Sequence, residues 1–224
     1  MKRAYICVAE QSGEGGVVFA ETNLAARKIA ADEWNDGELA GLSVRRAPGL
    51  DQYSDTGRVP ASVLICDYGW HWDGCCHCGQ YLDDESLRND GKDPALVVGF
   101  DGGQVFCDQS CADAARDQKA QEDAAGQAVL SALIERLHRR FGPVTIVRTH
   151  HFTRCRDGLC TTEQAVVDFD FPGQQHGMAA LRYEDRIVPG RTSIMPHDLY
   201  LVCPRGDVAT FEAWAAGLRQ EDAT

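Results

Sequence analysis

Four cysteines in two close pairs constrain this chain more than any other feature. Cys75 and Cys78 are separated by two residues, and a second pair, Cys107 and Cys111, is separated by three. Zinc prefers four thiolate or imidazole ligands in a tetrahedron, and two cysteines on one turn can reach the same ion. Cys111 falls where an alanine-rich helix is expected to begin, and the partial positive charge of a helix N-terminus favours thiolates. The spacing therefore predicts one zinc site.

The first pair leaves alternatives open, because Cys76 or His77 could replace a neighbouring ligand. Catalytic zinc keeps one position for water and usually carries histidine or carboxylate ligands, whereas four thiolates close the coordination shell. We therefore expect a structural zinc whose binding energy helps to fold an acidic, loop-rich segment. The competing interpretation is a set of buried thiols without a metal.

Residues 72–118 resemble the treble-clef class of zinc fingers, in which a Cys-x2-Cys knuckle, a β-hairpin and a cysteine pair at a helix start follow one another. The hairpin would cover residues 96–106, around the turn Asp101-Gly102-Gly103. The resemblance implies the same four cysteines as ligands. The three-residue spacer of the second pair departs from the commoner two.

The remaining pattern predicts an α+β protein in three parts. These are an N-terminal α+β unit over residues 1–68, a zinc-binding segment with its helix over 69–126, and a C-terminal antiparallel sheet flanked by helices over 127–224. Hydrophobic periodicity and turn residues predict the elements. Strands are expected at residues 3–9, 17–20, 42–46, 63–66, 144–150, 165–171, 179–183 and 199–203, and helices at 23–34, 128–141 and 208–218.

Five residues carry more detailed expectations for these elements. Leu24, Ile29 and Trp34 are expected to form the buried face of the first helix. Gly126 is expected to interrupt the helical stretch after the second cysteine pair, because glycine weakens a helix interior. Asp207 is a good N-cap for the last helix.

A third cysteine pair, Cys155 and Cys160, flanks an expected turn at residues 156–159. In a hairpin these two side chains would face each other across the strands. They could form a second metal site with His150, His151 or Cys203. The alternative is a cross-strand thiol pair, either reduced or oxidisable.

The charge distribution narrows the class of partner. The chain has a net charge of −12, and residues 71–126 hold twelve acidic and four basic residues. This balance argues against broad binding to a phosphate backbone, which needs clustered lysine and arginine. It favours a basic protein surface as partner, or solubility alone. Asp83, Asp84 and Glu85, in an expected solvated loop, are the candidate docking residues.

Arg148, Arg154 and Arg156 form the most concentrated basic group, and Phe152 lies among them. Basic and aromatic residues on one hairpin can contact phosphates and stack on bases. They therefore support an alternative hypothesis, a nucleic-acid-binding regulator that uses this hairpin.

An enzyme with a site on the C-terminal sheet is the third hypothesis. His150, His151, His176 and His197 could act as general acid or base. The sequence contains no phosphate-binding glycine loop and none of the common hydrolase or metalloprotease motifs. These absences weaken the enzyme hypothesis without removing it.

No stretch has the length and apolarity of a signal peptide or a membrane span. The expectation is a cytoplasmic protein whose ten cysteines are metal ligands or reduced thiols rather than disulfides.

The first 115 residues also resemble small uncharacterised proteins carried by bacteriophages and prophages. The resemblance rests on Val44-Arg45-Arg46-Ala47-Pro48, on Gly57-x-Val59-Pro60, and on the tryptophans before the first cysteine pair. It implies an accessory role toward the host. The leading hypothesis is thus a zinc-stabilised, acidic interaction protein that binds host nucleic-acid-handling machinery and modulates or inhibits it.

Overall fold

A computed structural model describes residues 1–156, 158–184 and 198–221. The chain divides into two compact units, Met1–Arg116 and Asp117–Thr224. Both units combine helices with antiparallel sheet, so the expected α+β class is confirmed. Within the described residues, no helix is both long and apolar enough to cross a bilayer. His197 lies outside the described residues.

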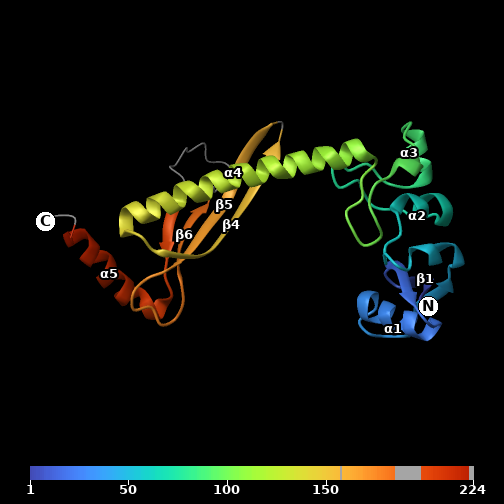
Figure 1. Cartoon of the computed structure of the whole chain (residues 1–224), viewed down its shortest axis with the longest axis horizontal. Coiled ribbons are helices and arrows are strands. Elements are labelled where there is room, and N and C mark those ends of the chain that lie inside the picture. Colours follow the sequence, from blue (N-terminus) through green and yellow to red (C-terminus); the bar gives the residue numbers. More distant parts are fainter. Residues whose placement is uncertain (157, 185–197, 222–224) are drawn as a thin grey trace. The chain divides into compact units, whose positions relative to one another are not determined.

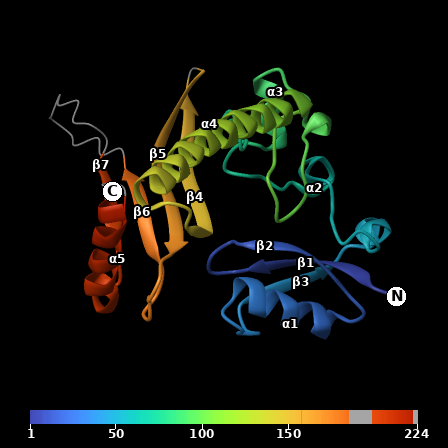
Figure 2. The same cartoon turned by 60° about the vertical axis from the view of Figure 1, so that its left-hand side comes forward.

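The first unit begins with a three-stranded antiparallel sheet. Its strands β1 (Arg3–Ala9), β2 (Gly15–Ala20) and β3 (Leu42–Arg46) are arranged in the order β2-β1-β3. Successive residues of β1 point to opposite faces, as in any strand. Tyr5 and Cys7 are buried under α1 (Asn23–Trp34), which lies across one face of the sheet (Figure 2).

Helix α1 occupies the expected residues, but its buried face differs from the prediction. The side chain of Thr22 caps the helix, accepting a hydrogen bond of 3.2 Å from the backbone nitrogen of Ala25. Ala26 and Ala30 are fully buried, whereas Leu24 is 58% and Ile29 44% exposed. Alanine faces the sheet because a small side chain lets the helix backbone approach the strands closely.

The opposite face of the sheet is covered by a short 3₁₀ helix, η1 (Pro48–Tyr53), and by α2 (Ala61–Tyr68). The predicted strand at residues 63–66 is therefore wrong. Ala61, Leu64 and Ile65 are buried at helical spacing, and Gly69 ends the helix in the left-handed conformation at φ 70°. An apolar run this short does not distinguish a strand from a buried helix.

Two further expectations for the first unit are corrected. The acidic stretch after residue 82 is not a loop throughout, because it contains helix α3 (Asp84–Asn89), which is followed by a 3₁₀ turn, η2 (Pro94–Leu96). The expected hairpin at residues 96–106 is reduced to one bridge, Val98 with Phe106, and Phe100 pairs instead with Pro60, outside the segment. The segment between the two cysteine pairs is thus mainly irregular backbone stabilised by a small core.

Helix α4 (Gln109–Phe141) begins in the first unit, and its residues from Asp117 onward belong to the second. It is continuous, so the predicted interruption at Gly126 is wrong. In the second unit it lies along a four-stranded antiparallel sheet (Figure 1). The strands β4 (Thr145–Arg156), β5 (Leu159–Asp170), β6 (Ala179–Glu184) and β7 (Asp198–Val202) follow chain order.

The core of the second unit lies between this sheet and two helices. Leu130, Leu133 and Leu137 of α4 are buried against the sheet, as their spacing predicts. After a 3₁₀ turn, η3 (Arg205–Asp207), helix α5 (Val208–Glu221) adds Phe211 and Trp214 to the same core. Their rings contact aromatic rings from α4 and from the end of β5 at centroid distances of 5.1–6.4 Å.

Candidate metal centre

The structure brings together the four cysteines that the sequence singled out. The sulfur atoms of Cys75, Cys78, Cys107 and Cys111 all lie within 4.8 Å of one another. Those of Cys78 and Cys107 are 3.5 Å apart. Four sulfurs at the corners of a tetrahedron with metal–sulfur bonds of ~2.3 Å would be about 3.8 Å apart. The donor set therefore has the size, number and chemistry to hold one metal ion.

A tight turn presents the first pair. The backbone nitrogen of Gly79 donates to the Cys75 carbonyl at 2.9 Å, and Gly79 adopts φ 73°, which glycine reaches without strain. The nitrogen of Cys75 in turn donates to the carbonyl of Gln80 at 2.7 Å. This local ring of hydrogen bonds forms the knuckle, and it explains why a two-residue spacer brings both sulfurs to one point.

The second pair sits where irregular backbone enters α4. The nitrogen of Cys76 donates to the carbonyl of Val105 at 2.9 Å, which joins the two cysteine segments. Asp108 caps the helix start, since its carboxylate accepts the backbone N–H of Cys111 at 2.9 Å. The hydrogen bonds from Ser110 and Cys111 lower the pKa of this carboxyl. Cys111 thus enters on the first turn of the helix, as predicted.

The surroundings of the four thiols favour a bound cation. Burial opposes ionisation of Cys75, but the N–H groups of Cys78, His77 and Cys107 outweigh it, so that the pKa of the Cys75 thiol is lowered. Burial, together with neighbouring thiols, raises the pKa values of Cys107 and Cys111. Cys107 and Cys111 therefore ionise less readily by themselves than a free cysteine, and a metal cation would supply the charge that compensates their thiolates.

Sequence reasoning missed Lys92, which lies beside the cluster. A hydrogen bond to the Cys107 sulfur raises the pKa of the Lys92 amino group, and the cluster thus gains one positive charge. Lys92 is fifteen positions from Cys107, so only the fold reveals this contact. Cys76 and His77 are exposed and are not among the four clustered ligands.

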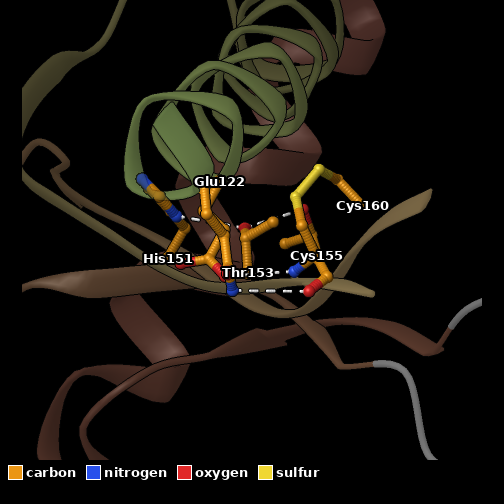
Figure 3. The surroundings of a disulfide bond; sticks show 7 residues. Glu122, His151, Thr153, Cys155 and Cys160 are labelled. Carbon is orange, nitrogen blue, oxygen red and sulfur yellow. Dashed lines mark hydrogen bonds between the residues drawn. A yellow bond between two sulfur atoms is a disulfide. The ribbon is translucent and has the colours of Figure 1, made fainter. Parts of the chain in front are cut away.

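Cys155 and Cys160 form a disulfide. They are paired directly across β4 and β5, so the expectation that the cysteines avoid disulfides is wrong at this pair. Figure 3 shows Glu122 of α4 facing this point, where its carboxylate accepts the N–H of Cys155 at 3.1 Å. The amide of Gln118 donates to the Cys155 carbonyl at 3.4 Å. Side chains of helix α4 thus form hydrogen bonds with the backbone of β4, the edge strand of the sheet.

The acidic candidates have separate positions on α3. Asp83 is the N-cap and accepts the N–H of Ser86 at 2.6 Å. Asp84 pairs with Arg88 at 3.0 Å, and the hydrogen bond from that guanidinium lowers the pKa of the Asp84 carboxyl. Glu85 is exposed. Two of the three candidates therefore already have a structural partner.

The basic candidates lie on β4, and two of them face carboxylates on β5. Arg148 binds the buried Asp168 at 2.7 Å, and Arg154 lies 3.6 Å from Glu163. The Arg154 guanidinium also lies over the Phe152 ring, 4.8 Å from its centroid. Arg156 is exposed. These pairings reduce the positive field that the hairpin would present to phosphates.

Of the three described candidate histidines, His176 has a carboxylate partner. Its Nδ1 lies 3.0 Å from Asp207, and the same carboxylate accepts the backbone N–H groups of Gln175 and His176 at 3.0 and 2.7 Å. Burial raises the pKa of Asp207, but these hydrogen bonds outweigh it and lower the pKa. Asp207 therefore ties the chain before β6 to the turn before α5, and its carboxylate bonds Gln175 and His176 in place of the predicted helix cap.

Comparisons of the chain with family models, with curated proteins and with solved structures find no match.

Proposed function

We propose that the metal is zinc and that it stabilises the fold of residues 69–116. The observation that carries the proposal is the closed set of four cysteine sulfurs within 4.8 Å. Thiolate ligands in a tetrahedron are typical of structural zinc, and they leave no position for substrate or water. A small core of Leu82, Leu87 and Val105 surrounds the ligands, so metal binding supplies folding energy that this core is too small to provide.

We propose further that the protein acts by binding a basic protein partner. The metal-binding part of the chain supports this, since residues 71–126 hold twelve acidic and four basic residues. Glu85 on α3 and Asp90 just after it are exposed. Such a surface attracts a lysine- and arginine-rich partner and repels nucleic acid. The resemblance to phage accessory proteins implies that this partner is a host protein that handles nucleic acid.

The two other hypotheses have weaker support. Carboxylates pair with Arg148 and Arg154, which lowers the affinity that the β4–β5 hairpin could have for phosphates. A hollow of about 710 Å³ in the second unit is lined mainly by apolar side chains, with Arg140 and Glu212. Its described lining includes none of the candidate histidines. An enzyme site needs several polar groups that point at one place, and the mainly apolar lining of this hollow gives the enzyme hypothesis little support.

Binding to two defined probes separates these functions. We expect the zinc-loaded chain to bind a fluorescent arginine-rich peptide more tightly than a DNA duplex of equal length, measured by anisotropy at 50–200 mM salt. Tighter binding to DNA would replace the proposal with the nucleic-acid hypothesis.

A matched pair of variants tests where the peptide binds. Glu85→Gln with Asp90→Asn is expected to weaken peptide binding at least fivefold. Glu21→Gln with Asp55→Asn removes the same charge from exposed positions elsewhere in the first unit and is expected to change it less than twofold. Equal effects of the two double variants would show unspecific attraction to net charge and would contradict a docking surface at α3.

A further inference from the structure

Three of the four tryptophans in the chain line one hollow of about 830 Å³ in the first unit. Trp34 comes from the end of α1, and Trp70 and Trp72 come from the segment after α2. All three are partly exposed. The metal-binding function proposed above does not use this hollow.

The two closest indoles are held in place by the core of the first unit. The ring centroids of Trp70 and Trp72 are 6.2 Å apart, and the ring planes are inclined by 43°. Both side chains pack against the buried cluster that includes Ile6 and Leu64. The two rings are therefore held at a set angle to each other, and one group could lie within about 6 Å of both centroids, the range of a cation–π contact.

The indole of the third tryptophan, Trp34, lies directly against Gly16 of β2. A Cβ atom at Gly16 would lie 2.4 Å from Cη2 of Trp34, so any larger residue there would displace the ring. Gly16 is buried, and Trp34 also packs against the core under α1. The position of this ring in the hollow is thus built into the β1–β2 hairpin.

The carboxylates that line the hollow give it a negative charge. Glu14, Glu33 and Asp73 line it, and all three are exposed. Among the described lining residues there is no lysine or arginine. Carboxylates that line the same hollow as indoles disfavour phosphates, which they repel, and neutral apolar ligands, which would desolvate the charges without compensation.

We infer that this hollow is a binding site for a weakly hydrated organic cation, with a quaternary ammonium or guanidinium group held against the indoles and balanced by the carboxylates. Aromatic rings with nearby acidic groups recognise this chemistry because the ring faces carry negative electrostatic potential. The cation can come from a free small molecule or from a methylated lysine or arginine side chain. The site goes beyond the docking surface at α3, and the substitutions that remove its carboxylates differ from those that test the docking surface.

The test uses two probes of the same shape and different charge. In the full chain with Trp214→Phe, the tryptophans at 34, 70 and 72 are the only ones left, so emission reports on the hollow. Choline is expected to change this emission saturably, beyond the effect of sodium chloride at equal ionic strength. Its neutral isostere, 3,3-dimethylbutan-1-ol, is expected to bind at least tenfold more weakly. Equal binding of the two probes, or no saturable change with choline, would overturn the inference.

Surface variants locate the site without disturbing the core. Glu14→Gln, Glu33→Gln and Asp73→Asn together are expected to weaken choline binding about tenfold. A control triple, Glu21→Gln, Glu38→Gln and Asp55→Asn, removes three exposed carboxylates that do not line the hollow and is expected to change binding less than twofold. Equal losses in both triples would mean that net charge alone attracts the cation, and the inference would fail.

Peptides separate the two sources of the cation. Short neutral peptides that contain one trimethyllysine or one arginine are titrated beside free choline. Tighter binding of either peptide supports a protein side chain as the natural ligand, whereas tighter binding of choline supports a free molecule.

Discussion

At the scale of single residues, the candidate metal centre consists of four cysteine sulfurs and of backbone N–H groups that point at them. Cys75 and Cys107 are buried, and the backbone nitrogen of Cys107 lies 3.5 Å from the Cys75 sulfur. Such contacts orient the ligands and stabilise negative charge on sulfur. Loss of a ligand therefore leaves buried polar atoms without the ion that compensates them.

The first prediction concerns one ligand and its neighbour. If the proposed zinc site is correct, Cys107→Ser binds no zinc and residues 69–116 unfold, because the free energy of zinc binding at such sites, about 10 kcal/mol or more, is mostly folding energy. Metal content per chain and thermal unfolding measure both effects. Cys76→Ser is the matched control, since Cys76 is exposed and outside the cluster. A metal-free Cys107→Ser chain with unchanged stability would contradict a structural zinc.

The second prediction concerns Asp207, whose pKa in the folded state is lowered by the hydrogen bonds from His176 and Gln175, against the effect of burial. A carboxyl with a lowered folded pKa stabilises the fold above its unfolded pKa of ~3.9, and the stabilisation is lost as the pH falls through the folded value. Asp207→Asn is therefore expected to lower the denaturation midpoint at pH 7, and this difference from the wild type should shrink below about pH 4. Glu212→Gln, an exposed carboxylate on α5, is the control. A difference that is constant between pH 7 and pH 3 would rule out this explanation.

At the scale of elements, α4 supports the free edge of β4. Gln118 and Glu122 bond the carbonyl and the N–H of Cys155, and Gly126 faces the ring of His151. Residues at i, i+4 and i+8 lie on one side of a helix, so these three contacts form a single line along the strand. Glycine is needed in this line because a Cβ at position 126 would lie 2.0 Å from the Nδ1 of His151.

The third prediction tests this contact by a double-mutant cycle. In an ordinary helix interior, replacing glycine with alanine stabilises by about 1 kcal/mol. Here Gly126→Ala is expected to lower the free energy of unfolding by about 1–2 kcal/mol, because the methyl group overlaps the imidazole. In a His151→Ala background, Gly126→Ala should instead raise the free energy of unfolding, as in an ordinary helix. Denaturant unfolding of the four proteins measures the cycle, and an equal effect in both backgrounds would show that the two residues do not interact.

At the scale of the whole molecule, the candidate metal ligands and the large aromatic cluster belong to different units. All four candidate ligands belong to the first unit, whereas an aromatic cluster around Phe169, Phe211 and Trp214 stabilises the second. Metal binding is therefore expected to stabilise one unit and to leave the other unchanged.

The fourth prediction follows from this division. Removal of metal by a chelator is expected to increase hydrogen exchange of peptides within residues 69–116, because their fold depends on the ion. Peptides from β5 and β6 should keep their protection. Mass spectrometry of exchanged peptides measures both regions, and simultaneous loss of protection in β5 and β6 would show that the units unfold together.

The sequence alone determined the features that depend on local spacing. Each cysteine pair could be predicted because two or three residues between cysteines on a turn bring two sulfurs together, whereas the meeting of the two pairs, 29 positions apart, depends on the fold. Thr22 could be assigned as a cap, and the stripe of leucines in α4 as a buried face, for the same reason: both are settled within one or two helical turns.

Only the tertiary structure decided features that depend on what packs from far along the chain. The run at residues 63–66 is part of helix α2, which packs on the sheet, and Gly126 lies inside α4 where the ring of His151 fills the space that a side chain would take. Trp34 joins Trp70 and Trp72 in one hollow although 35 positions separate it from the nearer of them. Contacts of this kind arise from long-range burial, and no periodicity within a short window reports them.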